Sequence, residues 1–398
     1  MENISVLICD DSALMRNLIS RIVNGIEGMN VVATAINGQF ALQKIPDVKP
    51  DIIILDIEMP TMNGIQFLEE RRKRGIDIPV IILSSVAKEG AAVTMQCLEL
   101  GASDFITKPG GSVSINIELV TADLVEMIAS YGGMYASRHG KPVGNVTYFM
   151  RQVKMHAAEH FVTQQKGTHG QTATAAKEQP SPLLSSMEKT VKEPAVITPE
   201  REGGRIDIIA IGISTGGPNA LREVFKMVSP GLQQPILVVQ HMPPGFTAEF
   251  AISLDRICPL KVTEAKDNDV LEGGHIYIAP GDSHIYVESH AQKNVIRLSQ
   301  DAPCNGHRPS VSYLFHSITK IYKNHALGVI MTGMGKDGAQ ELADMRKEGA
   351  WTLGQDEKTA IVYGMPKVAW ELGGVQKQVA LEDMAREICT LAKEHRTA

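Results

Sequence analysis

Residues 206–219 read IDIIAIGISTGGPN, an apolar run that stops at a glycine-rich turn. The run is rich in isoleucine and nearly uninterrupted, as in a strand of a parallel sheet that is covered on both faces. Gly212, Gly216 and Gly217 allow a sharp turn with close backbone approach, and Pro218 stands where the first position of a helix is expected. The stretch therefore predicts a strand, a tight turn and a helix in succession.

Within this turn, residues 212–216 satisfy the pattern G-x-S-x-G and expose Ser214. In a nucleophile elbow, this pattern places the serine at the sheet edge beside free backbone N–H groups. A glycine-rich phosphate loop of a nucleotide-binding domain fits the segment equally well when it is considered alone. Two details count against that alternative: the dinucleotide fingerprint requires glycine in place of Ser214, and the next apolar strand, 235–240, ends in Gln-His and not in an acidic residue.

The histidine at the end of that next strand, His241, is the candidate general base. It lies 27 residues after Ser214, about the length of one βαβ unit, so the two strand ends should be adjacent in a parallel sheet. A general base must reach the hydroxyl that it deprotonates, and this placement allows it. A hydrogen-bonded loop histidine is the alternative, and the position favours the catalytic role.

A carboxylate should orient the imidazole, and Asp282, Asp301 and Asp337 are the candidates. Asp337 follows the predicted strand 326–330 in a glycine-rich turn, so it again occupies the carboxyl end of a strand and is preferred. Asp282, with the nearby His284, is the second choice. The chain order serine, histidine, aspartate differs from that of α/β-hydrolases, but triads are recognised by role and not by order.

The first part of the chain alternates apolar runs with helical stretches, which predicts a doubly wound parallel sheet. The five runs are 5–9, 31–35, 51–55, 79–83 and 103–107. Polar residues stand just beyond four of these runs, where ligands collect in such sheets: Asp10, Asp11, Asp56, Ser84 and Lys108.

Three carboxylates at one point repel each other unless a hard cation lies among them, and oxygen ligands suit Mg²⁺. A hydroxyl from Ser84 and an ammonium from Lys108 complete an anion site. The pattern therefore indicates phosphoryl transfer onto a carboxylate, with Asp56 as the acceptor.

The motifs CDDS, LDIEMP, LSS and ITKP make the first ~120 residues similar to the response-regulator receiver family. The resemblance implies a flavodoxin-like fold and phosphorylation of Asp56 by a histidine kinase. It also implies a switch pair and a Mg²⁺ site. The switch pair is Ser84 and Phe105; the Mg²⁺ ligands are Asp10, Asp11, Asp56 and the carbonyl of either Glu58 or Ile57.

The motifs GISTGGP, QHMPPGFT, YIAPGDSHI, HRPSVSYLF and MTGMGKDGA resemble the catalytic domain of the chemotaxis protein-glutamate methylesterases. The resemblance implies Ser214 as nucleophile, His241 as base and Asp337 as orienting acid. Backbone amides near Thr215 and Met334 would form the oxyanion hole. It also implies a substrate, methylated glutamate on the cytoplasmic domain of a chemoreceptor, deamidation of receptor glutamines by some members, and an esterase reaction without a cofactor.

The predicted organisation is a receiver domain over 1–130, a flexible linker over 131–204 and a Rossmann-like methylesterase domain over 205–398. The linker segment loses hydrophobic periodicity and is rich in Gln, Thr, Ser, Lys, Glu and Pro. A short helix is compatible with residues 146–164. We expect the receiver to cover the catalytic strand ends and to loosen when Asp56 is phosphorylated.

Composition limits the remaining function classes. A net charge of −6 without clustered Lys and Arg argues against a nucleic-acid partner. Five scattered cysteines indicate buried thiols in a reducing compartment. No run reaches the ~18 apolar residues of a membrane span, so a cytoplasmic protein is expected, with a monomer as the default state. Two competing functions are a phosphorylation-dependent scaffold without enzyme activity and a nucleotide-binding effector.

Overall fold

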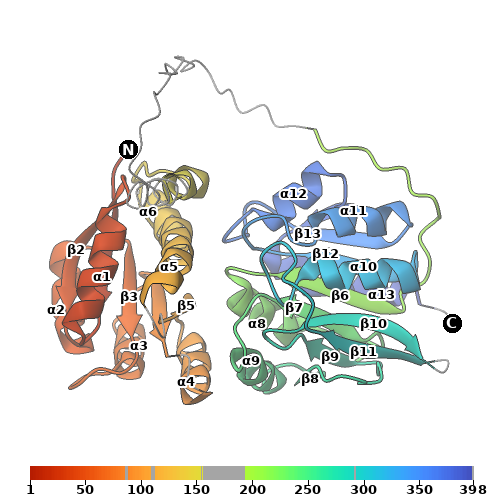
Figure 1. Ribbon diagram of the computed structural model, residues 1–398, viewed down its shortest axis with the longest axis horizontal. Coiled ribbons are helices and arrows are strands. Elements are labelled where there is room, and N and C mark those ends of the chain that lie inside the picture. The colour runs from red at the N-terminus through yellow and green to blue at the C-terminus, as the bar shows by residue number, and fades with distance from the viewer. Residues whose placement is uncertain (86–87, 109–112, 154, 156–192, 291–292, 397–398) are drawn as a thin grey trace, which may run out of the picture.

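The computed structural model describes residues 1–85, 88–108, 113–153, 155, 193–290 and 293–396. These residues form two α/β domains, each built on its own parallel sheet, and the two domains lie side by side (Figure 1). The prediction of two doubly wound parallel-sheet domains is confirmed. No helix in the described part of the chain combines the length and the apolar character needed to cross a bilayer.

The sheet of the first domain has the strand order β2-β1-β3-β4-β5, and all of its pairings are parallel. Its strands are β1 (Ile4–Cys9), β2 (Met29–Ala35), β3 (Ile52–Asp56), β4 (Val80–Ser84) and β5 (Asp104–Thr107). Each lies within about two residues of the predicted run. Both β3 and β4 are buried along their whole length, which explains why they contain so few polar residues.

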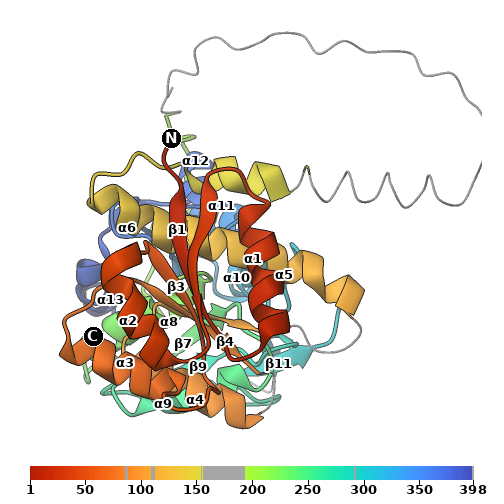
Figure 2. The ribbon, with the colours of Figure 1, turned by 90° about the vertical axis from the view of Figure 1, so that its left-hand side faces the viewer.

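Helices cover both faces of this sheet, with α1 and α5 on one face and α2, α3 and α4 on the other (Figure 2). Their bounds are α1 (Ala13–Asn24), α2 (Gly38–Val48), α3 (Gly64–Lys73), α4 (Lys88–Glu99) and α5 (Val113–Met127). Side-chain caps set where three of them begin. Ser12 accepts a hydrogen bond from the Met15 N–H, and Asn63 forms a capping box with Gln66. Asn37 caps α2 in the same way.

The sheet of the second domain has the order β14-β13-β12-β6-β7-β9-β8, again with parallel pairings throughout. Its strands are β6 (Ile208–Ile213), β7 (Ile236–Gln240), β8 (Lys261–Glu264), β9 (His275–Ile278), β12 (Ala326–Ile330), β13 (Trp351–Gln355) and β14 (Lys377–Val379). The central strands β6, β7 and β12 are entirely buried. Strand β6 lies between β7 and β12, which places three loops at one edge of the sheet.

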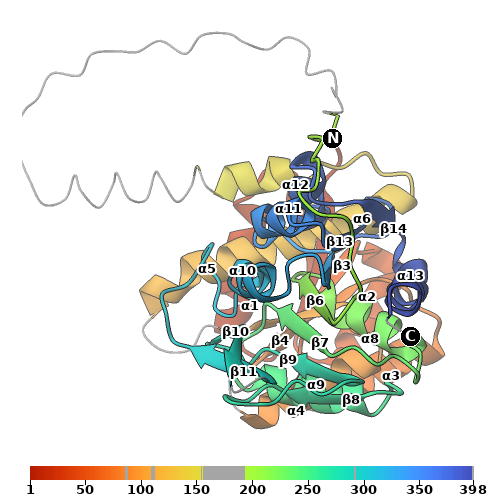
Figure 3. The ribbon, with the colours of Figure 1, turned by 90° about the vertical axis from the view of Figure 1, so that its right-hand side faces the viewer.

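Two groups of helices cover the second sheet (Figure 3). One group is α8 (Gly217–Met227), α9 (Phe246–Asp255) and α13 (Leu381–Glu394); the other is α10 (Val311–Tyr322), α11 (Ala339–Lys347) and α12 (Met365–Glu371). Pro218 is the second residue of α8, one position later than predicted. An antiparallel hairpin of β10 (His284–His290) and β11 (Lys293–Ser299), which was not predicted, packs against α10.

The predicted linker over 131–204 requires a correction to its boundaries. Helix α5 continues through a π-helical turn, η1 (Ile128–Gly132), into α6 (Gly133–Arg138), and a helical segment over 146–153 follows. Phe149 of that segment is fully buried, and Lys141 forms an ion pair with Asp51 at 2.8 Å, so this part belongs to the first domain. The sequence did not predict this contact, because the apolar residues of the segment stand between polar ones and form no periodic pattern. Most of the remaining tether, residues 156–192, lies outside the described residues.

The other end of the predicted linker lies on the second domain. The backbone N–H of Ala195 donates to the Glu371 carbonyl, and the N–H of Glu200 donates to the Lys347 carbonyl. The indole of Trp351 donates to the Gly204 carbonyl at 2.9 Å. Backbone hydrogen bonds of this kind require no apolar pattern, so composition alone could not reveal them.

Candidate active site

The loops after β6, β7 and β12 carry the three predicted catalytic side chains. Ser214 follows β6 directly and His241 follows β7 directly, while Asp337 lies in the loop between β12 and α11. Because β7 and β12 are the two neighbours of β6, the three loops meet at the carboxyl edge of the sheet. Sheet order thus brings together residues that are far apart in the chain.

The three side chains form a continuous hydrogen-bonded relay. The Nδ1 atom of His241 lies 3.1 Å from the Oγ atom of Ser214, and its Nε2 atom lies 2.8 Å from Oδ2 of Asp337. Because the carboxylate accepts, Nε2 carries the proton and Nδ1 is free to accept the serine proton. The imidazole therefore faces the serine with Nδ1, whereas in the chymotrypsin triad Nε2 faces it. Both orientations allow the same proton transfer.

Asp337 is buried, and several neighbouring polar groups donate hydrogen bonds to its carboxylate in addition to His241. Ser310 Oγ donates at 2.7 Å, the Val311 N–H at 2.7 Å and the Asn305 side chain at 3.0 Å. Burial alone would raise the pKa of this carboxyl, but the hydrogen bonds and charge of His241, with Ser310 and Asn305, hold the pKa well below its usual range. The group is therefore a permanent anion that can orient an imidazole.

The other two candidate carboxylates lie elsewhere. Asp282 is exposed and forms an ion pair with Arg308 at 2.6 Å, and Asp301 is exposed and accepts from the Tyr313 hydroxyl at 2.5 Å. The buried His284, named with Asp282 as the second choice, accepts a hydrogen bond from the Ser310 N–H. His284 therefore contacts Ser310, which itself binds Asp337, and it does not take the place of Asp337 in the relay.

A residue that sequence analysis did not name, Gln240, ties the nucleophile to the base. Its Nε2 atom donates to the carbonyl oxygens of both Ser214 and His241, at 3.1 Å each. Space for this amide exists because Gly217 has no side chain; a Cβ atom there would lie 1.9 Å from Gln240 Oε1. Its position directly before His241, in the QHMP motif, was the sequence signal that could have identified Gln240 as a residue of the site.

In the turn after β6, a glycine and not the serine has the left-handed backbone, so Ser214 itself lacks the backbone strain expected of a nucleophile elbow. Gly216 has a φ angle of +81°, which glycine adopts readily, and the Ser214 N–H donates to the Thr332 carbonyl. Among the described residues, nothing accepts a hydrogen bond from the backbone N–H of Thr215 or of Met334. Both residues line the same cavity as Ser214, so these two amides are available to a ligand there.

This cavity, of about 570 Å³, lies between the two domains. Ser214, His241 and Met334 line it from the second domain, and Phe105 and Glu126 line it from the first. A ligand approaching Ser214 therefore meets side chains from both halves of the chain.

Two buried carboxyls of the first domain contact the elbow directly. Glu126 accepts a hydrogen bond from the Thr215 hydroxyl at 3.1 Å, and Asp104 accepts one from the Gly216 N–H at 3.0 Å. Burial raises the pKa of Glu126 to about 8 and the pKa of Asp104 to about 6, against the lowering effect of these hydrogen bonds. Neither residue was named from the sequence, because nothing in the local pattern marks an interdomain contact.

The rest of the interdomain contact comes from neighbouring elements. The rings of Phe105 on β5 and Phe246 on α9 stack with centroids 4.9 Å apart. The Asn219 side chain donates to the carbonyls of Ala102 and Ser103. Helix α4 also packs against α9, as the arrangement in Figure 1 shows.

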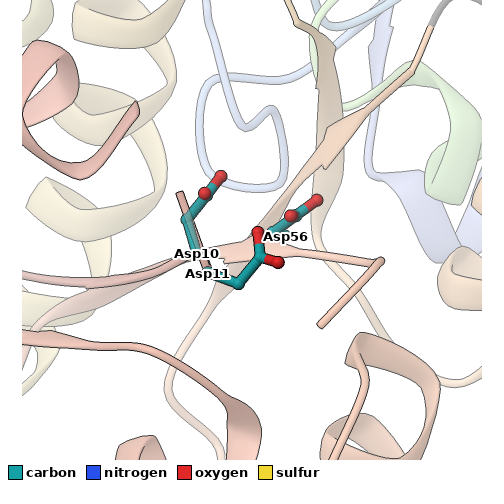
Figure 4. A group of neighbouring side chains, drawn as sticks. All are labelled: Asp10, Asp11 and Asp56. Atoms are coloured by element: carbon teal, nitrogen blue, oxygen red, sulfur yellow. The ribbon is translucent and has the colours of Figure 1, made fainter. Parts of the chain in front are cut away.

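At the carboxyl edge of the first sheet, Asp10, Asp11 and Asp56 converge (Figure 4). Each offers a carboxylate oxygen, and these three atoms lie within 4.8 Å of one another. The buried Oδ2 atom of Asp10 has no hydrogen-bond partner among the described residues, although Lys108 Nζ lies 3.4 Å away. Three carboxylates, one of which has a buried oxygen without a hydrogen-bond donor, fit the oxygen ligation of a hard divalent cation.

Lys108 also lies 2.7 Å from Oδ1 of Asp56. Burial, together with the charge of Asp10, raises the pKa of Asp56, although Lys108 opposes this shift. The carbonyl of Ile57 accepts a hydrogen bond from the Gly64 N–H, whereas none of the described groups donates to the Glu58 carbonyl. Of the two carbonyls left open by the sequence, the one of Glu58 is therefore available to a cation.

The predicted switch pair occupies two different environments. Phe105 is largely buried against Phe246 of the second domain. The hydroxyl of Ser84 accepts from Thr94 of α4 at 2.6 Å and lies 3.4 Å from the Gly90 carbonyl. In this structure Ser84 is thus bound to α4, and its contact with a phosphoryl group on Asp56 stays a prediction.

Comparison with known proteins gives a consistent result for both domains. The family model for the response regulator receiver domain matches residues 6–118, and the CheB methylesterase model matches residues 209–388. A protein-glutamate methylesterase/protein-glutamine glutaminase of Treponema denticola is 52% identical over 99% of this chain and 100% of that protein. One of Treponema pallidum is 48% identical over 97% of this chain and 96% of that protein. The solved catalytic domain of Thermotoga maritima CheB methylesterase is 36% identical and covers 47% of this chain and 98% of that chain, with a TM-score of 0.46.

Proposed function

Because the chain belongs to the family of protein-glutamate methylesterase/protein-glutamine glutaminases, which join a receiver domain to a CheB methylesterase domain, we propose that its serine relay hydrolyses glutamate methyl esters on chemoreceptors. The observation that carries this proposal is the relay itself, with His241 3.1 Å from Ser214 and 2.8 Å from Asp337. In this reading Ser214 is the nucleophile, His241 the general base and Asp337 the orienting acid.

In the acylation step, Ser214 Oγ forms a bond to the ester carbonyl carbon while His241 Nδ1 takes the hydroxyl proton. The carbonyl oxygen becomes an oxyanion, for which the N–H groups of Thr215 and Met334 are the proposed donors. The tetrahedral intermediate then collapses, the bond to the methoxy oxygen breaks, and His241 returns its proton to the departing methanol. Asp337 stabilises the imidazolium that exists between these two transfers.

In the deacylation step, His241 removes a proton from water while the water oxygen attacks the acyl carbon. The bond from that carbon to Ser214 Oγ then breaks, His241 returns the proton to Oγ, and glutamate leaves. The same residues can hydrolyse a glutamine carboxamide, in which case ammonia leaves in place of methanol. We therefore propose that the chain also deamidates receptor glutamines, since its Treponema relatives are named protein-glutamine glutaminases as well as methylesterases. No part of this chemistry calls on a cofactor.

We propose that phosphorylation of Asp56 by a histidine kinase activates the esterase. The receiver contributes Phe105 and Glu126 to the cavity around Ser214, so the docked receiver restricts the approach of a receptor helix. Asp10, Asp11, Asp56 and the Glu58 carbonyl would hold Mg²⁺, which supplies positive charge against phosphoryl oxygens when bound. Lys108 would neutralise another phosphoryl oxygen, and Phe105 would carry the change to the domain contact.

The proposed partners follow from this chemistry. They are the cytoplasmic domain of a chemoreceptor as substrate and the chemotaxis histidine kinase as phosphodonor, which imply a cytoplasmic enzyme that associates with receptor arrays. We propose that the enzyme acts as a monomer without binding nucleic acid. The alternative is a phosphorylation-dependent scaffold without enzyme activity. Such a scaffold would not require the hydrogen-bonded relay of Ser214, His241 and Asp337.

Methanol release from a methylated receptor domain, measured with and without an acyl phosphate and Mg²⁺, tests the proposal. The Ser214→Ala variant should bind receptor and retain its fold but release no methanol. Undiminished turnover by Ser214→Ala would eliminate the serine mechanism. Receptor binding without any turnover by the unmodified chain would favour the scaffold.

A further inference from the structure

A second histidine, His307, lies flat against the imidazole of His241. The two ring centroids are 3.8 Å apart and the ring planes differ by 10°. His307 belongs to the loop between β11 and α10 and lines the cavity that contains Ser214. His307 takes no part in the hydrogen-bonded relay, because both ring nitrogens of His241 already have partners.

The loop that carries His307 contains a tight turn closed by backbone hydrogen bonds. Asn305 and Gly306 have φ angles of +52° and +82°, as in a type I′ turn, for which Asn-Gly is the preferred pair. Cys304 and His307 flank this turn and exchange two backbone hydrogen bonds of 3.0 and 3.1 Å. The backbone of His307 is therefore fixed relative to the turn.

Two further contacts tie the loop to the rest of the domain. Arg308 binds Asp282 with two of its nitrogens and donates to the carbonyls of Gln300 and Asp301. Asn305 donates to Asp337 Oδ1 at 3.0 Å. One short loop thus touches the base of the relay through His307 and the acid through Asn305.

The His307 ring carries no charge under ordinary conditions. Burial lowers the pKa of His307 to about 4, and the adjacent His241 contributes to this shift, while Asp337 opposes it. A neutral ring can lie against an imidazolium without charge repulsion and presents its π face to the cation. A charged ring at the same place would oppose protonation of His241.

We propose that His307 is a positioning residue that holds the plane of the His241 imidazole during proton transfer. The inference rests on the proposed serine esterase function. Two hydrogen bonds fix the two nitrogens of His241 but leave its ring free to tilt about the line that joins them. A flat ring at 3.8 Å limits that tilt and keeps the Nδ1 lone pair directed at the Ser214 hydroxyl. It also stacks on the imidazolium that forms in the transition state.

The test compares flat and non-flat side chains at this position in the full chain, activated with an acyl phosphate and Mg²⁺. His307→Phe keeps an aromatic plane, whereas His307→Leu fills similar space without one, and His307→Ala leaves the face of His241 bare. Because an aromatic stack contributes about 0.5–1.5 kcal/mol, kcat for methanol release should fall roughly two- to tenfold in the Leu and Ala variants. KM should stay within about twofold, and His307→Phe should retain most of kcat.

A spectroscopic measurement complements the kinetics. The proton on His241 Nε2, which bonds to Asp337, should give a downfield imidazole N–H resonance in the free enzyme. We expect this resonance to persist in His307→Phe and to broaden in His307→Leu. His290→Ala removes an exposed histidine of the same domain and should change neither kcat nor the resonance.

Several results would overturn the inference. Equal kcat values for the Phe, Leu and Ala variants would exclude a role for the flat ring, and a change confined to KM would indicate substrate contact. If His307→Ala does not fold, the comparison of Leu with Phe still decides the question. Failure of the proposed function is recognised separately, because the unmodified chain would then release no methanol, or Ser214→Ala would release it at the unmodified rate.

Discussion

The carboxyl of Glu126 in the receiver domain accepts a hydrogen bond of 3.1 Å from the hydroxyl of Thr215, the residue that follows the proposed nucleophile. Asp104 accepts from the next residue, Gly216, so two acidic side chains of one domain hold the elbow of the other. Tyr131 and Asp123 are further titratable neighbours of this pair. Control of the esterase can therefore act on the loop that presents Ser214 as well as on access to the cavity.

This contact predicts a pH-dependent basal activity. The pKa of Glu126, about 8, is raised by burial, so the docked arrangement holds this proton more tightly than a released receiver does. The equilibrium constant for docking of the receiver is therefore largest at low pH. It falls as the pH rises towards 8, by up to about tenfold per pH unit. The ratio of phosphodonor-stimulated to basal methanol release should fall between about pH 6 and 8. Measuring the ratio cancels any pH dependence that the basal and the stimulated reaction share.

The Glu126→Gln variant provides the control for this pH effect. Glutamine keeps the acceptor for Thr215 but cannot ionise, so the ratio should stay high as the pH approaches 8. The same pH dependence in Glu126→Gln and in the unmodified chain would refute the assignment to Glu126.

Removal of the interdomain aromatic stack should raise the basal rate. Phe105 and Phe246 stack at 4.9 Å, and an aromatic pair of this kind contributes about 0.5–1.5 kcal/mol. In Phe105→Ala, methanol release without a phosphodonor should therefore increase roughly two- to tenfold. Phe40→Ala removes a half-exposed ring from α2 and should leave the basal rate unchanged. A basal rate in Phe105→Ala equal to that of Phe40→Ala would argue against docking as the restraint.

Stimulation by an acyl phosphate should depend on the acidic cluster, and basal turnover should not. We expect Asp56→Asn to abolish stimulation because no carboxylate remains to accept the phosphoryl group. Chelation of Mg²⁺ should have the same effect on the unmodified chain, while methanol release without a phosphodonor persists. Asp47→Asn, at an exposed position on α2, should remain fully stimulated. Loss of basal turnover on chelation would contradict an esterase reaction that needs no metal.

The space beside Gln240 should be sensitive to a single methyl group. A Cβ atom at Gly217 would lie 1.9 Å from Gln240 Oε1 and displace the amide that holds the Ser214 and His241 carbonyls. Gly217→Ala should therefore lower the free energy of unfolding by about 1–3 kcal/mol and reduce kcat. At Gly231 the nearest atom to such a Cβ would be the Ser229 Oγ atom at 3.6 Å, so Gly231→Ala should be tolerated. Urea unfolding and methanol release measure the two effects, and equal behaviour of the two variants would show that Gln240 does not matter.

Local patterns were sufficient to predict the strands of the first sheet and the three central strands of the second, β6, β7 and β12. Short isoleucine-rich runs such as those that form β3 and β6 favour strands buried on both faces, and polar residues at their ends mark the edge where function collects. Ser214 and His241 could be paired for the same reason, since they end consecutive parallel strands. The predicted linker was too long because Phe149 and the backbone of residues 193–204 make contacts that have no periodic signature.

The sequence by itself determined which side chains stand at strand ends, because the period and length of apolar runs fix where buried strands stop. Only the tertiary structure decided which carboxylate meets His241: β12 lies beside β6, so Asp337 reaches the imidazole while Asp282 pairs with Arg308 at the surface. Only the tertiary structure brought His307, Asp104 and Glu126 to the site. Strand order and domain docking arise from packing between segments distant in the chain, and no local pattern encodes those distances.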